Sequence, residues 1–346
     1  MPLVFLSWLL KRLRTLHSMF KCRLMPASRM ATPGGRILVT GALGQIGTDL
    51  VEELRTRHGT DSVIASDVRE VPGHPFLEDG PFRLLSVLDG DGMDAVVRED
   101  GVATIYHLAA ILSATGEKNP GLCRRVNVGG ITNVLETAMK HDLRVYAPSS
   151  IAVFGPDAPK IASQNSPLNP TTTYGETKCT GEALARGYLD RFGVDCRGIR
   201  YPGLISWKAP AGGGTTDYAV EIFHSALEKG HYECFVRPDT RLPMMYIDDA
   251  IRATLELMDA PPESLGNSRA GYNVSGISFT AQELADAIAE RIDGFTCDFV
   301  PDVRQTYADS WPDAVDDSVT REEWGWEAEY DLGSMVDAML EGLSSN

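Results

Sequence analysis

Acidic residues are absent from the first part of the chain, where no Asp or Glu precedes Asp49. Arginines and lysines occur throughout this stretch, and the apolar residues between positions 5 and 13 fall on one face of a possible helix. An Arg-rich, amphipathic start without acids is typical of a mitochondrial presequence, which predicts the mitochondrial matrix as the location. A disordered leader, or translation from Met25 or Met30, would explain the same composition. Under each interpretation we exclude residues 1–34 from the fold.

Long apolar runs, paired cysteines and an excess of positive charge are absent as well. The apolar run from Leu3 to Leu10 is too short to cross a bilayer. The six cysteines include no C-x-x-C pair and no histidine at ligand spacing, so we expect reduced thiols and no metal site. The formal net charge of −16 argues against nucleic acid and anionic membranes as partners. The 346 residues suit one large or two closely joined globular domains.

Residues 36–59 have the order of a strand, a glycine-rich turn and a helix. Arg36 to Thr40 is a short β-branched apolar run, and the glycines Gly41, Gly44 and Gly47 follow it directly. In this context glycines let the backbone turn tightly and approach a pyrophosphate at the N-terminus of the helix. The motif therefore predicts a dinucleotide site, although a glycine motif without this context is weak evidence.

A carboxylate ends the next predicted strand, which runs from Ser62 to Asp67. At this position a carboxylate accepts hydrogen bonds from the adenosine ribose and repels a 2′-phosphate. Asp67 therefore favours NAD over NADP. Arg69 lies close enough to weaken that preference, or it is a solvated surface arginine.

Strands and helices alternate further along the chain. We expect strands at 82–87, 104–110 and 144–149, and helices at 91–98, 122–141 and 174–192. This alternation predicts a doubly wound parallel sheet of the α/β class, whose ligand crevice lies at the carboxyl ends of the strands. Those ends are Gly41, Asp67, Val87, Ala109 and Ser150.

Tyr174 and Lys178 are four residues apart, which places both on one face of the predicted helix. A free phenol has a pKa of about 10, and a fixed ammonium one turn away favours the phenolate. Lowering that pKa by about 2–3 units requires roughly 3–4 kcal/mol of differential stabilisation. The pair predicts a general base, although Tyr-x-x-x-Lys also occurs by chance in many chains. Ser150 could hold the same substrate oxygen or simply cap a turn.

Together these motifs resemble those of the extended short-chain dehydrogenases/reductases. The resemblance covers residues 36 to about 340 and rests on the glycine spacing and on Asp67, His107 to Ala110, Asn127, Pro148 to Ser150, Phe154–Gly155 and Tyr174/Lys178. It implies a Rossmann-like sheet of the seven-strand type over residues 35–205, to which 246–260 contribute. A smaller α/β substrate lobe would occupy most of 206–346.

The same resemblance implies the site residues, the cofactor and the assembly. Tyr174 would be the general acid/base, Lys178 its electrostatic partner, and Ser150 the residue that orients the reacting oxygen. A homodimer would form through the helices at 122–141 and 174–192. The cofactor would be NAD, without a metal. The residues expected to contact it are Gly41, Gly44, Gln45, Ile46, Gly47, Asp67, Val68, Arg69, Val87, Leu108, Ala109, Ala110, Asn127, Tyr174, Lys178, Tyr201 and Pro202.

Residues 212–217 place three glycines and two threonines before a helix that is expected to start near Asp217. The free N–H groups there could seat a carboxylate, or Thr216 or Asp217 could cap the helix. With 112–114, 241–246 and 309–312, this segment resembles the short-chain type of L-threonine 3-dehydrogenases. The resemblance implies NAD-dependent oxidation of L-threonine at C3 to 2-amino-3-oxobutanoate. The residues expected to contact the amino acid are Ser113, Ser150, Tyr174, Gly214, Thr215, Thr216, Arg241 and Trp311.

Three alternatives stay open. Arg241 could bind the substrate carboxylate or form a structural ion pair. The chain could be a nucleotide-sugar epimerase of the same superfamily, which would need a roomier and more basic site for a diphosphate. It could also be a non-catalytic NAD-binding regulator, which would need none of Ser150, Tyr174 and Lys178.

Overall fold

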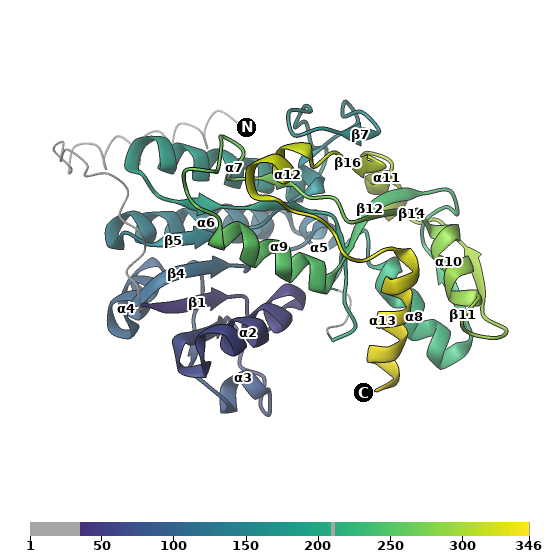
Figure 1. Cartoon of the computed structure of the whole chain (residues 1–346), viewed down its shortest axis with the longest axis horizontal. Helices are drawn as coiled ribbons and strands as arrows, with labels where there is room; N and C mark the ends of the chain where they lie inside the picture. Colours follow the sequence, from purple (N-terminus) through teal and green to yellow (C-terminus); the bar gives the residue numbers. More distant parts are fainter. Residues whose placement is uncertain (1–34, 209–211, 346) are drawn as a thin grey trace. The chain divides into compact units, whose positions relative to one another are not determined.

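Figure 1 shows a computed structural model of the chain, which describes residues 35–208 and 212–345. The predicted presequence therefore lies outside the described residues. The central feature is a parallel sheet of six strands in the order β3-β2-β1-β4-β5-β8. Its strands are β1 (Arg36–Thr40), β2 (Val63–Asp67), β3 (Phe82–Leu84), β4 (Val102–His107), β5 (Arg144–Tyr146) and β8 (Cys196–Arg197). This is the strand order of a doubly wound sheet, as the alternation of elements predicted.

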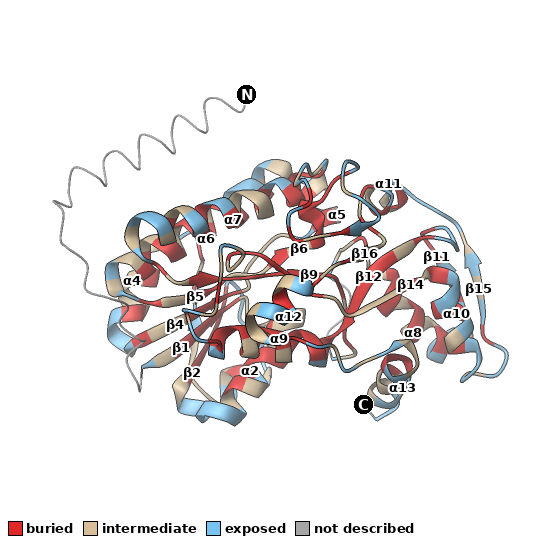
Figure 2. Cartoon of the chain, turned by 45° about the horizontal axis from the view of Figure 1, so that its top comes forward, coloured by how far each residue is buried: buried red, intermediate tan, exposed pale blue. Residues whose placement is uncertain are grey.

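Helices cover both faces of this sheet (Figure 2). One layer contains α4 (Gly90–Asp100), α6 (Pro120–His141) and α7 (Thr173–Phe192), and the other contains α2 (Gln45–His58) and α9 (Ile247–Asp259). Within these layers α6 packs along α7, and α2 packs against α9. Strands covered on both faces must be apolar, and β1 and β2 are accordingly buried along almost their whole length.

Two strands of the sheet are interrupted close to the crevice. After β5 the chain continues as the short strand β6 (Ser149–Ser150), and after β8 it continues as the strand β9 (Ile199–Tyr201). These two pair with β13 (Tyr272–Asn273) in a second parallel sheet of order β13-β9-β6. The expectation of one seven-stranded sheet is therefore corrected. Pro148 lies at the interruption, and a proline has no N–H with which to continue the ladder.

Two strands end earlier than the sequence predicted. β3 ends at Leu84 rather than residue 87, and β4 ends at His107 rather than residue 110. The residues that follow both strands line clefts at the edge of the sheet. Apolar sequence alone does not distinguish a buried strand from an apolar cleft wall, which explains the difference.

The remaining elements form a smaller α/β lobe with three short sheets. The strands are β10 (Gly203–Ile205), β12 (Arg241–Tyr246) and β14 (Ile277–Thr280) in one sheet, β11 (His231–Cys234) with β15 (Thr296–Phe299), and β7 (Ile161–Ala162) with β16 (Ala314–Val315). The helices are α8 (Tyr218–Lys229), α10 (Ala281–Ala289), α11 (Arg304–Ala308), α12 (Ser318–Trp324) and α13 (Leu332–Ser344). A capping box of Thr280 and Glu283 begins α10.

Short connecting elements complete the first lobe. They are α3 (Pro75–Glu78), α5 (Ser113–Lys118) and the 3-10 turns η1 (Thr60–Ser62) and η2 (Ile151–Val153). The buried apolar core is continuous between the lobes, since one cluster contains Val39 of β1, Phe223 of α8 and Met335 of α13. Within the described ranges, no helix has both the length and the apolar character needed to cross a membrane.

Candidate active site

A cleft lies at the carboxyl ends of the strands, where the two lobes meet. The lining residues come from the turn after β1, from the segments after β4 and β9, from the starts of α5 and α7, and from the loop before α8. The cleft is lined by Gln45, Ile46, Leu108, Ala110, Leu112, Ser113, Pro148, Ser149, Ser150, Ile151, Tyr174, Lys178, Tyr201, Pro202, Gly203, Leu204, Gly214, Thr215, Thr216, Asp217 and Trp311. Residues far apart in the sequence therefore meet at one place, as the sheet topology requires.

Tyr174 and Lys178 face this cleft from the first two turns of α7. The Lys178 ammonium lies 5.6 Å from the centre of the Tyr174 ring. Its Nζ donates a hydrogen bond of 2.7 Å to the carbonyl oxygen of Pro148. The helical spacing thus places the two side chains on one face, and the strand end before Ser149 holds the lysine.

The pKa of the Tyr174 phenol corrects one expectation. Burial raises this pKa to about 12, although a hydrogen bond with Ser150 acts in the opposite direction. Burial lowers the pKa of Lys178 to about 8. The sequence predicted that the lysine would lower the phenol pKa, but in this cleft desolvation of the phenolate has the larger effect.

Of the two roles that the sequence left open for Ser150, the structure confirms the cap, and the role toward a substrate oxygen stays a prediction. Its side chain lines the cleft with the Tyr174 phenol and acts to lower the pKa of that phenol. Its Oγ also accepts a hydrogen bond of 3.2 Å from the backbone N–H of Ala152 and so caps the turn η2. The cap fixes the direction of the hydroxyl oxygen, so that the structural role supports the chemical one.

A buried ion pair behind the cleft was not predicted from the sequence. Glu182 and Arg200 are both about 4% exposed, and their side chains form two hydrogen bonds of 2.8 Å. Glu182 also accepts a hydrogen bond of 2.6 Å from Ser149, next to Ser150. Glu182 follows Lys178 by four residues, as Lys178 follows Tyr174. This spacing alone places Glu182 on the same face of the helix and could have indicated its position. Arg200 is supplied by the neighbouring strand β9, which only the fold reveals.

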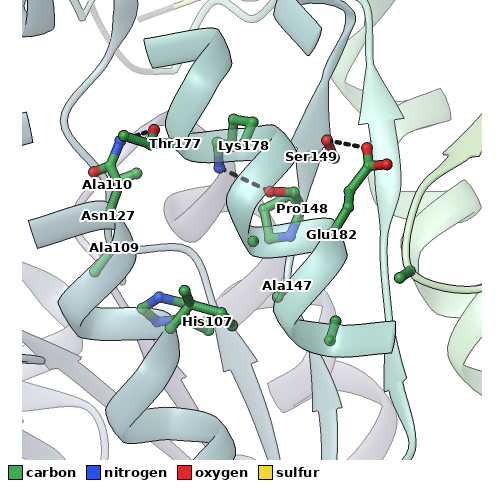
Figure 3. Close-up of a pocket in the computed structure, with 14 residues that line it drawn as sticks. His107, Ala109, Ala110, Asn127, Ala147, Pro148, Ser149, Thr177, Lys178 and Glu182 are labelled. Atoms are coloured by element: carbon green, nitrogen blue, oxygen red, sulfur yellow. Dashed lines mark hydrogen bonds between the residues drawn. The ribbon is translucent and has the colours of Figure 1, made fainter. Parts of the chain in front are cut away.

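A second, smaller cavity lies behind Lys178, between α6, α7 and the sheet (Figure 3). Asn127 faces it, but the side chain is committed to protein contacts. Its Oδ1 accepts from the Ile111 N–H at 2.8 Å, and its Nδ2 donates to Thr177 Oγ1 at 3.0 Å. His107 lies there too, 2.9 Å from Thr40 Oγ1, and burial lowers the histidine pKa to about 3. His107 is therefore neutral at ordinary pH.

A second cleft lies at the first three strands, where the sequence predicted the adenosine site. Its lining residues are Gly41, Gly44, Asp67, Val68, Arg69, Leu85, Ser86, Val87, Leu88, Leu108, Ala109, Ala110, Ile111, Leu122 and Val126. Asp67 is 7% exposed, and its carboxylate accepts hydrogen bonds from the backbone N–H groups of Leu43 and Arg69 at 3.3 and 3.2 Å. The Arg69 side chain is 66% exposed. The carboxylate at the end of β2 is therefore held in place from both sides.

Two glycines of the turn after β1 have positions that no other residue could take. Gly41 has a φ of +73°, and a Cβ there would come within 2.7 Å of the Ala109 nitrogen. A Cβ on Gly47 would come within 2.5 Å of the Gly41 carbonyl oxygen. The close packing of turn, helix and strand therefore requires glycine at both positions. That the N-terminus of α2 receives a pyrophosphate stays a prediction.

The residues expected to contact the amino acid do not all meet. Ser113, Gly214, Thr215, Thr216 and Trp311 line the main cleft with Tyr174 and Ser150. Arg241 does not line it. Its guanidinium instead forms an ion pair of 2.6 Å with Glu283 and donates to the Ser278 carbonyl, which is the structural alternative.

Asp217 lines the cleft and was not predicted as a site residue. Its carboxylate accepts hydrogen bonds of 2.7 Å from the backbone N–H groups of both Gly213 and Gly214. The side chain makes no capping hydrogen bond to α8, so the capping alternative is wrong for this residue. Burial raises the pKa of Asp217, and the two N–H groups oppose that shift. Two N–H groups of the glycine loop before α8 thus bind a carboxylate from the chain itself.

The fold and the two clefts define an NAD-binding enzyme scaffold, and comparison with known proteins gives its family. Residues 37–274 match the NAD dependent epimerase/dehydratase family, to which the chain belongs. NAD is accordingly the cofactor of this scaffold. Gly41, Gly47 and Asp67 fit that cofactor, because they leave room for a pyrophosphate and place a carboxylate at the ribose position.

Particular relatives are similar over almost the whole chain. An uncharacterized epimerase/dehydratase of Staphylococcus aureus is 47% identical over 89% of this chain and 96% of its own length. The mitochondrial L-threonine 3-dehydrogenase of Bos taurus is 47% identical over 88% of this chain and 82% of its own. A monomeric L-threonine 3-dehydrogenase from a metagenome has a solved structure that is 52% identical, with a TM-score of 0.86 over 89% of this chain and 99% of its own. The similarity to L-threonine 3-dehydrogenases that the sequence indicated is therefore confirmed.

Proposed function

We propose that this protein oxidises L-threonine at C3 with NAD, giving 2-amino-3-oxobutanoate and NADH. The observation that carries the proposal is the lining of the main cleft, where Tyr174 and Ser150 face Ser113, Thr215 and Thr216. The first pair is suited to remove a proton from a hydroxyl group. The hydroxyl groups of Ser113, Thr215 and Thr216 could donate hydrogen bonds to a ligand as small as an amino acid. The similarity to L-threonine 3-dehydrogenases supports the same substrate.

Each of the cleft residues would have its own role in the oxidation at C3. Ser150 would hold the C3 oxygen, and Tyr174 as phenolate would take the hydroxyl proton. Lys178, fixed by the Pro148 carbonyl, would support the phenolate and bind the ribose. Bound NAD would accept the two electrons and the hydrogen that leave C3. Leu112 and Trp311 would limit access of water to the reacting atoms.

The same lining separates this proposal from a nucleotide-sugar epimerase. Among the described residues that line the main cleft, Lys178 is the only lysine or arginine, and its ammonium is already bonded. A sugar diphosphate needs positive charge that this lining does not supply. A non-catalytic NAD-binding regulator is disfavoured because it would not need Ser150, Tyr174 and Lys178 together.

One experiment tests all three functions. Purified protein with NAD is mixed with L-threonine, L-allothreonine, L-serine or UDP-sugars, and NADH absorbance at 340 nm is followed. We expect net NADH with L-threonine and none with UDP-sugars. Epimerisation of a UDP-sugar without net NADH would establish the epimerase instead, and binding of NAD without turnover of any compound would favour the regulator.

The N-terminal composition also indicates a location for the protein. We propose the mitochondrial matrix, because the N-terminal composition matches a presequence and the bovine relative is named mitochondrial. A fusion of residues 1–34 to a fluorescent protein should enter mitochondria, and a fusion that stays in the cytosol would contradict this location.

We also propose a homodimer through α6 and α7. The exposed sides of these helices are polar and include an ion pair of 2.6 Å between Arg124 and Glu176. Such a dimer would be held by polar contacts and would weaken as salt is added. Light scattering should show twice the chain mass at low salt, whereas the chain mass at every concentration would match the monomeric relative.

A further inference from the structure

The first turn of α7, which carries Tyr174, is capped by a residue from another helix. The Oε1 atom of Glu117 accepts a hydrogen bond of 2.6 Å from the Thr173 N–H and lies 3.4 Å from the Tyr174 nitrogen. Thr172 Oγ1 accepts the third N–H, that of Gly175, at 3.1 Å. The free N–H groups of a helix start are thus satisfied, two of them by Glu117. An anionic carboxylate also suits the positive end of the helix dipole.

Glu117 lies at the end of α5, a short helix that is fixed against its surroundings. A Cβ on Gly116 would come within 2.9 Å of the Cys123 Sγ on α6 and within 3.9 Å of the Tyr174 Cβ. Gly116 therefore packs tightly against α6, and α5 is in contact with the start of α7. A displacement of α5 would have to move the backbone at Tyr174 as well.

The other side of α5 contacts the loop that lines the substrate side of the cleft. A Cβ on Gly212 would come within 2.8 Å of Leu112, and a Cβ on Gly213 within 2.7 Å of Thr115 Oγ1. Ser113, the first residue of α5, lies 3.4 Å from Thr215 between the two hydroxyl oxygens. A single six-residue helix thus touches the glycine loop at one end and caps the tyrosine helix at the other.

We propose that Glu117 is a positioning residue that aligns the substrate-contacting helix α5 with Tyr174. It does not touch the reacting atoms and acts through the backbone of Thr173 and Tyr174. The inference rests on the proposed function, because it assigns Glu117 to the alignment of the substrate that Ser113 contacts with the base Tyr174. An error of about 1 Å in such an alignment can cost on the order of a hundredfold in rate.

The test compares Glu117→Ala and Glu117→Gln with Glu176→Ala. Glu176 is an acidic residue of the same helical turn, but it is exposed and pairs with Arg124. We expect Glu117→Ala to lower kcat for L-threonine by about 10- to 100-fold per NAD-binding site, with a much smaller change in KM. Glu117→Gln keeps an oxygen acceptor for the same N–H groups and should stay within about threefold of the natural protein. Glu176→Ala should keep the kcat of the natural protein, because its side chain is exposed and accepts no N–H of the first turn.

Two further measurements separate alignment from a simple helix cap. Amide hydrogen exchange over residues 171–177, measured without substrate, should accelerate in Glu117→Ala alone. In a double-mutant cycle, Ser113→Ala combined with Glu117→Ala should lose less than the product of the two single losses, because both act on one alignment. Faster exchange with unchanged kcat, or fully multiplicative losses, would overturn the positioning role. Failure of the natural protein to oxidise L-threonine would instead overturn the proposed function, and the exchange result would still report on the cap.

Discussion

Burial shifts the pKa values of Tyr174 and Lys178 in the main cleft more than their neighbouring residues do. The phenol of Tyr174 and the ammonium of Lys178 both shift toward their neutral forms, because each charged form loses hydration in the cleft. A general base must ionise near neutral pH. The Tyr174 phenol therefore needs a positive charge beside it to ionise near neutral pH. A cationic nicotinamide ring beside the phenol would favour the phenolate, so we expect cofactor binding to complete the base.

The high pKa of the Tyr174 phenol should make the activity depend on pH. The Tyr174 phenol has a pKa of about 12 in the protein alone, so only a small fraction is ionised at neutral pH. Adding NAD should lower that pKa, and kcat should rise with pH through the lowered value. Ultraviolet difference titration of phenolate, with and without NAD, measures the shift, and Tyr174→Phe identifies which phenol is seen. A phenol pKa that NAD leaves unchanged would contradict this account.

Replacement of the phenol tests the base directly. Tyr174→Phe removes the hydroxyl and keeps the ring that packs in the cleft. We expect kcat for L-threonine to fall by about 10²- to 10⁴-fold, the usual contribution of a positioned general base. NAD affinity, measured by calorimetry, should change little because the ring and Lys178 remain. Turnover close to that of the natural protein would mean that another group removes the proton.

Among the elements, α7 was the most predictable and its partners the least. Its apolar and polar spacing predicted residues 174–192, and the helix spans Thr173–Phe192. The positions of Tyr174 and Lys178 on one face followed from helical geometry alone. The sequence could not show that Glu117 caps this helix, because Glu117 lies more than fifty residues earlier and meets it only through the fold. Long-range pairs of this kind leave no local pattern.

Arg241 and Asp217 show the same limit for charged residues near the substrate. An arginine close to a substrate lobe is consistent with either a carboxylate ligand or an ion pair, and only the position of Glu283 in α10 decides between them. Asp217 has the sequence position of a helix cap, yet its carboxylate turns back to Gly213 and Gly214. Composition predicts that such groups lie near the site, whereas side-chain direction depends on packing.

The contact between α7 and β9 through Glu182 and Arg200 gives a prediction at the level of elements. Glu182→Gln leaves a buried guanidinium without its counter-charge, and loss of one partner of such a pair costs about 3–5 kcal/mol of unfolding free energy. Glu182 also raises the pKa of Lys178 through its charge. Its loss should therefore lower the lysine pKa and move the alkaline fall of kcat to lower pH. Urea unfolding and the pH profile of kcat measure the two effects.

Asp249→Asn is the matched control for that variant. Asp249 of α9 is 1% exposed and pairs with Arg252 at 2.8 Å, but it does not line the cleft. We expect an unchanged pH profile with a smaller loss of stability, because Arg252 keeps its ion pair with Glu256. Equal shifts of the profile in both variants would show that Glu182 contributes only to stability.

At the scale of the whole molecule, the two clefts differ in which lobe supplies their lining residues. The adenosine cleft is lined only by residues up to Val126 in the first lobe, whereas the main cleft takes residues from both lobes. Cofactor binding should therefore depend mainly on the first lobe, and amino-acid binding on how the lobes meet. The apolar core is continuous between the lobes. Ligand binding that stabilises one lobe should therefore raise the free energy of unfolding of the entire described chain.

Thermal unfolding with NAD and NADP tests this view together with the role of Asp67. A ligand at about 100 times its Kd stabilises the folded state by about 2.7 kcal/mol. For a chain of this size we expect a rise in Tm on the order of several degrees with NAD. NADP should give a smaller rise, since its 2′-phosphate would meet the buried Asp67 carboxylate. Asp67→Asn removes that charge and should bring the two shifts closer together. Equal shifts in the natural protein would contradict selection of NAD by Asp67 and would indicate that the exposed Arg69 accommodates the 2′-phosphate.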